Sequence, residues 1–323
     1  MNSRFTSLEV CAGVGGQALG LERAGFDPVM LVDDDPQTCA TLRANRPDWR
    51  VLQADLNDFV GTEHGGVADV DLLSAGVPSA PFATAGRQHG ISDRRDLLRT
   101  VIFLVMDVRP RVVMLESTPN LLTNSKFEAV RRFVSNELEH MGYCWTSSVL
   151  DAQHFGVPQT RRSGIIIAMR PDDFERFSWP VGNRHAPTLG EALRESMASR
   201  GWSGADEWAR IANQVAPTIV GGSKKHGGAD LGPTRSKRSW QALGVDGGSL
   251  GDQVPGPEFV LAPEAGRSGL PKLTIAQVQL LQNLPTDWEV TGRKTAAYRQ
   301  VAQAMPPAVS TAVGRHIAQA LAR

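Results

Sequence analysis

At 323 residues the chain is long enough to bury a large core, and its length fits one large domain together with a smaller one. The 34 Lys and Arg residues are balanced by 34 Asp and Glu residues, so no field of one sign covers the whole protein. This balance argues against a protein that simply coats nucleic acid. Any surface that binds nucleic acid must be local.

The N-terminal sequence and the cysteine spacing indicate where the protein is expected to reside and whether a metal site or a disulfide is expected. The first residues lead directly into an apolar strand, and no apolar run approaches the length that spans a membrane, so we expect a cytoplasmic protein without membrane association. Cys11, Cys39 and Cys144 lie far apart and show no Cys-x-x-Cys or Cys/His spacing. We therefore expect neither a metal site nor a disulfide.

Residues 5–26 are predicted to form a strand, a glycine turn and a helix. Apolar and polar residues alternate along the predicted strand, which runs into Ala12-Gly13-Val14-Gly15-Gly16. Apolar residues in 17–26 then recur at helical spacing, and a glycine near the end of this range stops the predicted helix. Glycines let the backbone approach a ligand and leave the first N–H groups of the helix facing it. Such a turn alone is common in α/β folds. Gly-x-Gly-x-x-Gly is absent, which argues against a dinucleotide oxidoreductase.

Acidic residues close the next two predicted strands. The predicted strand over residues 28–32 is followed by three aspartates at positions 33–35. Asp33 is placed to accept hydrogen bonds from both hydroxyls of a ribose. The alternative, a solvated helix cap, better describes Asp34 and Asp35. A third strand over residues 51–54 ends in Asp55. Together these segments predict a nucleotide-binding unit.

Residues 71–99 combine a buried strand with a loop rich in Gly and Pro, and this loop contains Pro78 and Ser79. Loops after parallel strands commonly carry function. A serine hydroxyl needs an adjacent general base to act as a nucleophile, and the sequence places no such base beside Ser79. A serine in a plain Gly/Pro turn is therefore a strong alternative for this residue.

Two further strand ends carry polar residues. A helix over 96–108 and a buried strand over 112–115 lead to Glu116. Glu116 is a candidate functional residue, and the alternative is that it only caps the end of the strand. A helix over 127–141 and a strand over 144–150 lead to a basic loop that contains Gln159 and Arg161, followed by a strand over 164–169. The sequence therefore predicts several polar side chains at strand ends.

From about residue 172 to 268 the chain is rich in Gly, Pro and Ser and shows weak periodicity. Five basic residues in this flexible frame suit contacts with phosphates and guanine edges, although a solvated loop is the alternative: Lys224, Lys225, Arg235, Lys237 and Arg238. Residues 308–322 are predicted to form a closing helix.

Several motifs together resemble the DNA cytosine-C5 methyltransferases. In chain order they are the glycine turn with Gly-Leu-Glu-x-Ala-Gly-Phe, the loop Gly-Val-Pro-x-x-Pro-Phe-x-x-Ala-Gly with Asp93-x-Arg95, Glu116, Gln159-x-Arg161 and residues 272–288. The resemblance covers nearly the whole chain. It implies an α/β fold: a mostly parallel, Rossmann-like sheet flanked by helices, with a smaller, irregular target-recognition domain. The implied parts are a cofactor-binding and catalytic domain (1–171), the target-recognition domain (172–270) and a C-terminal segment that returns to the first domain (271–323).

The resemblance also implies the ligands and their residues. The expected cofactor is S-adenosylmethionine, bound by Ala12, Gly13, Gly15, Gly16, Asp33, Asp55, Pro78 and Gln303. Glu116 would hydrogen-bond N3 of a flipped cytosine, with Ser79 beside C6 and Gln159 and Arg161 supporting the nucleotide. The expected macromolecular partner is double-stranded DNA, contacted by Arg87, Arg95, Lys224, Lys225, Arg235, Lys237 and Arg238. A partner methyltransferase subunit or a restriction endonuclease is a further expected partner.

This chain departs from the family pattern at functional positions. The family has its nucleophilic cysteine where Ser79 stands, Asn where Ser117 stands, Arg where Ser163 stands and Gly-Asn where Ala302-Gln303 stands. A thiol with a pKa of about 8.5 gives usable thiolate near neutrality, whereas a serine gives almost no alkoxide. Two hypotheses follow: a methyltransferase in which Ser79 lies beside C6, and a catalytically silent protein that binds DNA or serves an active partner.

Overall fold

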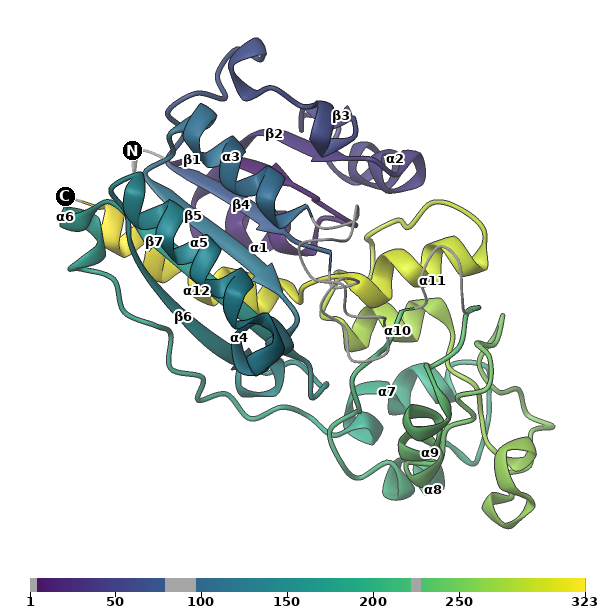
Figure 1. Ribbon diagram of the computed structural model, residues 1–323. Coiled ribbons are helices and arrows are strands. Elements are labelled where there is room, and N and C mark those ends of the chain that lie inside the picture. Colours follow the sequence, from purple (N-terminus) through teal and green to yellow (C-terminus); the bar gives the residue numbers. More distant parts are fainter. Residues whose placement is uncertain (1–4, 79–96, 222–227, 323) are drawn as a thin grey trace. The chain divides into compact units, whose positions relative to one another are not determined.

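The computed structural model describes residues 5–78, 97–221 and 228–322 and divides the chain into two compact units (Figure 1). The first unit comprises residues 1–150, 162–181 and 309–323, and the second comprises residues 151–161 and 182–308. Each unit is therefore built from separate stretches of the chain.

A seven-stranded sheet in the order β3-β2-β1-β4-β5-β7-β6 forms the centre of the first unit. Neighbours from β3 to β5 are parallel, and β7 pairs antiparallel with β5. This confirms the predicted mostly parallel α/β sheet. The strands are β1 (Phe5–Val10), β2 (Phe26–Asp33), β3 (Val51–Gln53), β4 (Leu72–Gly76), β5 (Val112–Ser117), β6 (Cys144–Asp151) and β7 (Arg162–Met169).

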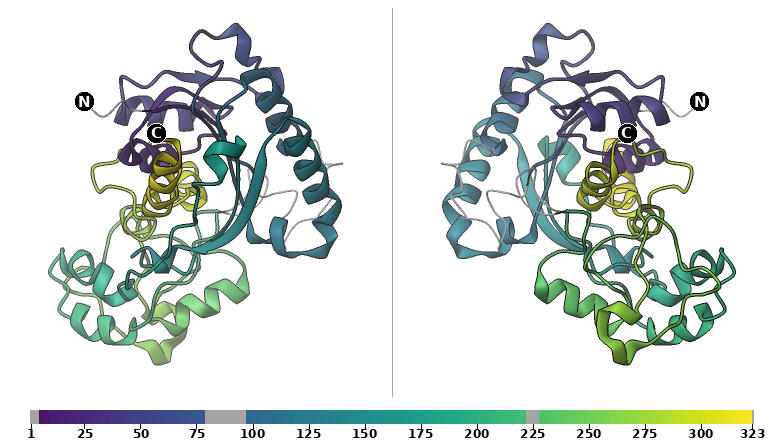
Figure 2. Two further views of the ribbon diagram at one scale, coloured as in Figure 1. Left: turned by 90° about the vertical axis from the view of Figure 1, so that its left-hand side faces the viewer. Right: turned by 90° about the vertical axis from the view of Figure 1, so that its right-hand side faces the viewer.

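Helices cover both faces of this sheet (Figure 2). Alternate residues of β1, β4 and β5 pack with the apolar sides of α3 and α5 in one core. Gly314 of α12 lies against Leu21 and Ala24 of α1 on the other face, where an added Cβ would come within 2.8 Å of Ala24. The helices are α1 (Gly16–Ala24), α2 (Pro36–Asn45), α3 (Leu98–Val108), α4 (Pro119–Thr123), α5 (Glu128–His140), α6 (Pro171–Phe174) and α12 (Pro307–Leu321).

In the described part of the second unit, short helices are joined by long irregular segments. Thr188 and Thr274 begin α7 and α10 with capping boxes, in which the threonine hydroxyl and the side chain three residues later satisfy the first N–H groups. Trp208, Trp240 and Tyr298 are fully buried and anchor its core. Its helices are α7 (Leu189–Ala198), α8 (Ala205–Ile211), α9 (Thr234–Ala242), α10 (Ile275–Leu281) and α11 (Lys294–Gln303).

One expectation for this region is wrong. Residues 234–242, predicted to lie in a flexible frame, form the regular helix α9. Trp240 is the buried residue of this helix, whose other positions are exposed or partly exposed, so burial of this indole anchors the helix. In the described ranges no helix is both long and apolar enough to cross a bilayer.

Candidate cofactor and catalytic site

The glycine turn after β1 bends through three residues with positive φ: Cys11 at 52°, Gly13 at 56° and Gly15 at 89°. Glycine adopts such angles without steric cost. The Gly15 amide donates to the Ala12 carbonyl at 3.2 Å, which closes the turn directly before α1. A Cβ added to Gly13 would meet no described atom within 4 Å. The backbone at Gly13 is therefore open to a close ligand.

Asp33 ties the end of β2 to this turn. Its carboxylate accepts the Gly13 amide at 2.9 Å and the Asp35 amide at 3.0 Å. Burial raises the pKa of Asp33, and these two hydrogen bonds oppose the rise. A carboxylate has about four acceptor positions, so the two amides leave capacity for ribose hydroxyls. The turn and Asp33 together fit a nucleoside cofactor, and the ribose contact stays a prediction.

Asp35 and Asp55 both act as caps. Asp35 accepts the amides of Gln37 and Thr38 and begins α2, as the helix-cap alternative predicts. Asp55 accepts the Asn57 amide at 2.9 Å and begins a short 3-10 helix. The contact of Asp55 with adenine stays a prediction.

The ends of β4 and β5 lie beside the glycine turn. Gly76 pairs in register with Glu116, and the Val77 amide donates to the Glu116 carbonyl at 2.8 Å. A Cβ added to Gly76 would lie 3.1 Å from the Cys11 carbonyl oxygen. Pro78 follows directly, so the edge of the sheet brings Cys11, Gly76 and Glu116 together. Of the predicted site residues, Ser79, Arg87, Arg95, Lys224 and Lys225 lie outside the described residues.

Cys11 does not supply a substitute thiolate at this edge. Burial, followed by the negative charges of Asp33, Asp34 and Asp55, raises the pKa of the Cys11 thiol far above its usual range. The group therefore stays protonated at neutral pH.

A buried polar cluster beneath the turn was missed by the sequence reasoning. We call it the Glu9 cluster: Ser7, Glu9, Gln17 and Ser74, each at most 7 % exposed. The Gln17 amide nitrogen donates to the Ser74 hydroxyl, linking the first turn of α1 to β4. Glu9 Oε1 has no hydrogen-bond partner among the described residues. The available signal was an acid at an alternating strand position directly before a glycine turn.

Gln159 and Arg161 lie in the second unit and hold backbone there. Gln159 is fully buried, and its side chain accepts the Ile219 amide at 2.8 Å and donates to Gln282. The Arg161 guanidinium donates to the carbonyls of Ala302 at 2.9 Å and Gln303 at 3.2 Å. The guanidinium has five N–H donors, so these hydrogen bonds leave donors for a nucleotide. That contact stays a prediction.

Gln282 is a second residue that the sequence reasoning missed. It is fully buried at the end of α10, where its amide nitrogen donates to the carbonyls of Val301 at 2.8 Å and Ala304 at 3.0 Å. Its oxygen accepts from Gln159. Gln282 therefore fixes the segment that contains Gln303, whose own side chain is exposed. Gln282 lies within the motif of residues 272–288, but the sequence of that motif gave no sign of these hydrogen bonds.

The basic residues of α9 differ in their surroundings. Lys237 forms an ion pair with Asp230 at 3.4 Å and is only 24 % exposed. Arg235 and Arg238 are exposed and lie three residues apart, which places them on one face of the helix. This face can present two guanidinium groups to an anionic partner.

Comparison with known proteins agrees with this arrangement. The model of the C-5 cytosine-specific DNA methylase family matches residues 5–319. The chain is 44 % identical to the type II methyltransferase M.NaeI of Lentzea aerocolonigenes, over 97 % of this chain and 75 % of that protein. It is 40 % identical to M.NgoMIV of Neisseria gonorrhoeae, over 98 % of each chain.

A solved structure shows the same fold at low sequence identity. A DNMT2 mutant of Spodoptera frugiperda superimposes with a TM-score of 0.65 at 13 % identity, covering 97 % of this chain and 99 % of that one. With the family model spanning nearly every residue, the chain belongs to the C-5 cytosine-specific DNA methylase family.

Proposed function

We propose that this chain binds S-adenosylmethionine and duplex DNA as a cytosine-C5 methyltransferase-like protein of a type II restriction–modification system. The observation that carries the proposal is the register at the edge of the sheet, where the glycine turn, Gly76 and Glu116 lie side by side. The family uses S-adenosylmethionine as methyl donor. The relatives with 40–44 % identity are named type II methyltransferases, which supports the DNA substrate and the system.

In the proposed cofactor site, the glycine turn, Asp33, Asp55, Pro78 and Gln303 hold the cofactor. When bound, it supplies the methyl group that cytosine C5 accepts. Asp33 would accept hydrogen bonds from the ribose hydroxyls while the Gly13 amide keeps its carboxylate in place. Calorimetry of Asp33→Ala is expected to show at least tenfold weaker cofactor binding, because both the ribose contact and the turn lose their acceptor. Asp34→Ala, which removes an exposed acid next in the chain, is the control and should bind like the unaltered protein.

In the proposed reaction, Glu116 donates a hydrogen bond to N3 of the flipped cytosine and makes C6 more electrophilic. A nucleophile then adds to C6, C5 takes the methyl group, and loss of the C5 proton lets the nucleophile leave. Gln159 and Arg161 would support the flipped nucleotide. Ser79 stands at the nucleophile's position in the family motif. An un-ionised hydroxyl adds far more slowly than a thiolate, so we expect slow or absent methyl transfer by the unaltered chain.

The residue at 79 also favours a second function, that of a silent DNA-binding member which serves an active methyltransferase subunit or a restriction endonuclease. Transfer of labelled methyl groups to mixed-sequence duplex DNA separates the two functions. Turnover by the unaltered protein would exclude the silent function, and turnover only by Ser79→Cys would support it. If both are inert while calorimetry shows cofactor binding, the departures at Ser117, Ser163, Ala302 and Gln303 also limit the reaction.

We further propose that residues 172–270 form the target-recognition domain and that Arg235, Lys237 and Arg238 contact DNA together with Lys224, Lys225, Arg87 and Arg95. The support is the exposed guanidinium pair on α9. Each lost phosphate contact lowers the slope of log affinity against log salt by about 0.9. Replacing Arg235 and Arg238 with Gln is therefore expected to lower that slope by nearly two, and an unchanged slope would exclude the contact.

A further inference from the structure

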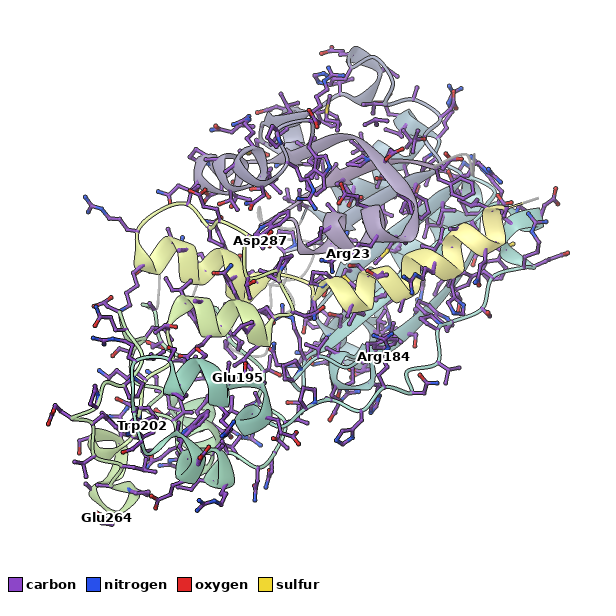
Figure 3. The ribbon with its side chains drawn as sticks, turned by 180° about the vertical axis from the view of Figure 1, so that it is seen from behind. Arg23, Arg184, Glu195, Trp202, Glu264 and Asp287 are labelled. Atoms are coloured by element: carbon purple, nitrogen blue, oxygen red, sulfur yellow. The ribbon has the colours of Figure 1, made fainter. Side chains whose placement is uncertain are left out.

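A pocket in the second unit is lined mostly by residues within 172–270 and includes none of the residues given an individual role so far. Its volume is about 640 Å³, and its polar and aromatic lining includes Asp246, Ser249, Gln253, Phe259, Arg267 and Lys272. Two stretches of chain form it and pair through their backbones. The Asp246 amide donates to the Pro271 carbonyl at 2.9 Å, and the Gly251 amide donates to the Leu273 carbonyl at 2.8 Å. We call it the Arg267 pocket; Trp202 and Glu264 mark this part of the second unit in Figure 3.

The Arg267 guanidinium lies close to a glycine, Gly248. A Cβ added to Gly248 would lie 3.0 Å from Arg267 Nη1 and 3.0 Å from Asp246 Oδ1, which is closer than a comfortable contact. The same Asp246 oxygen accepts the Gly248 amide at 2.9 Å. The absence of a side chain at Gly248 therefore lets the planar guanidinium lie against this turn.

The second cation of the pocket, Lys272, pairs with Asp246. Lys272 Nζ lies 3.9 Å from Asp246 Oδ2, and the Lys272 side chain is 45 % exposed whereas the Asp246 side chain is 13 % exposed. Asp246 thus pairs with Lys272 at the pocket while its own side chain remains largely covered. The charge of the lining is +1.

An aromatic wall completes the pocket. The Phe259 ring meets the Trp202 ring edge-on, with centroids 5.2 Å apart and planes at 89°. The Trp202 indole N–H donates to the Phe259 carbonyl at 2.9 Å. A hydrogen bond as well as the ring contact therefore holds Phe259 in place. An apolar ring in the same lining as a guanidinium suits the edge of a base pair, where apolar groups lie next to hydrogen-bonding atoms.

The surrounding unit is more basic than the chain as a whole. Its sequence carries three more Lys and Arg than Asp and Glu, whereas the whole chain carries equal numbers. An isolated phosphate would face the Asp246 carboxylate and would gain nothing from Phe259. Arginine presents two parallel donors that match O6 and N7 of guanine.

We propose that the Arg267 pocket reads a guanine edge in duplex DNA, with Arg267 as the specificity-determining residue and Lys272 as its companion cation. This assignment rests on the proposed function, because it requires that the chain binds duplex DNA. It adds a site of base readout to the phosphate-contacting face of α9. Ser249 and Gln253 supply hydroxyl and amide groups for neighbouring polar atoms of the base pair.

Selection from a duplex library with randomised base pairs, followed by sequencing of the retained DNA, tests the assignment. The unaltered protein should enrich a motif that contains guanine. Arg267→Gln should lose the preference at one guanine position, keep the rest of the motif and bind the best sequence about tenfold more weakly or worse. Arg267→Lys keeps the charge but not the paired donors, so it should lose the same preference.

Two further variants complete the design. Gly248→Ala retains Arg267 and requires its guanidinium to shift by only a few tenths of an ångström, so it should keep more of the guanine preference than Arg267→Gln does. Arg210→Gln removes an exposed arginine of α8 outside the pocket, and its motif should match that of the unaltered protein. Thermal unfolding of each variant confirms that it is folded.

Three outcomes would overturn the assignment. Arg267→Gln could enrich the unaltered motif with unchanged affinity. It could weaken every sequence equally while the salt slope falls by about one, which would identify a phosphate contact. In both cases DNA binding itself persists, so the proposed function survives. If the unaltered protein retains no duplex at low salt, the proposed function fails as well.

Discussion

Replacing Glu9 with Gln should make the stability of this protein less dependent on pH. Glu9 lies on β1 beneath the glycine turn and is 2 % exposed. Burial raises the pKa of its carboxyl from an ordinary 4.5 to about 7, and the side chains of Ser7, Ser74 and Gln17 only partly oppose the rise. The folded protein therefore keeps a proton on Glu9 over a range in which the unfolded chain has lost it.

The sign and size of the effect follow from proton linkage. Between about pH 4.5 and pH 7 the folded state binds more protons at this residue, so the free energy of unfolding falls as pH rises. One pKa unit corresponds to about 1.4 kcal/mol, which gives a loss of about 3 kcal/mol over the whole range. The stabilisation is complete below the unfolded pKa and is gone above the folded one. Gln carries no ionisable proton and contributes no such dependence.

Urea unfolding of the unaltered protein and of Glu9→Gln at pH 5, 6, 7 and 8 measures this effect. The difference between the two free energies cancels every other titrating group and should move by about 2–3 kcal/mol in favour of Glu9→Gln between pH 5 and pH 8. Glu63→Gln makes the same chemical change at an exposed position and controls for the substitution itself. A difference that stays constant across the four pH values would refute the reasoning.

Three further substitutions test the packing and the polar networks, each by urea unfolding. Asp173→Asn should cost about 1–3 kcal/mol, because this carboxylate is 8 % exposed and pairs with Arg111 and Arg176, while Asp69→Asn in an exposed pair should change little. Gln282→Leu should cost about 3 kcal/mol, since the carbonyls of Val301 and Ala304 and the Gln159 amide each lose one hydrogen bond within a buried network; exposed Gln241→Leu is the control. Gly269→Ala should be strongly destabilising because a Cβ there would lie 1.9 Å from the Ala262 oxygen, whereas Gly65→Ala, with no described atom within 4 Å, should be mild. Equal costs for a variant and its control would contradict the corresponding argument.

Sequence pattern predicted the parts of this molecule that depend on local order. The strand, glycine turn and helix of residues 5–26, the acid at the end of β2 and the strand before Glu116 all follow from periodicity and punctuation by glycine. Helix α9 was missed because its stability comes from the burial of one residue, Trp240, in an otherwise polar stretch. Propensity over nine residues cannot show what that indole packs against.

The polar networks were hidden for a different reason. Gln282 bonds to Gln159 more than a hundred residues away, and Arg161 reaches carbonyls near residue 302. A family motif records that such residues occur, but their partners depend on how distant segments meet. Likewise, the perturbed acid at Glu9 arises from burial between β1, α1 and β4, which no local pattern measures.

The chain passes between its two units four times, so neither unit is encoded by one continuous stretch of the gene. An exchange of sequence preference between relatives that transplants residues 182–308 alone would leave behind residues 151–161, and with them the Gln159 and Arg161 that Gln282 and Ala302 require. A hybrid must therefore inherit both stretches from the same parent. Conversely, removing residues 309–323 would take from the first unit the part of α12, including Gly314, that packs against α1.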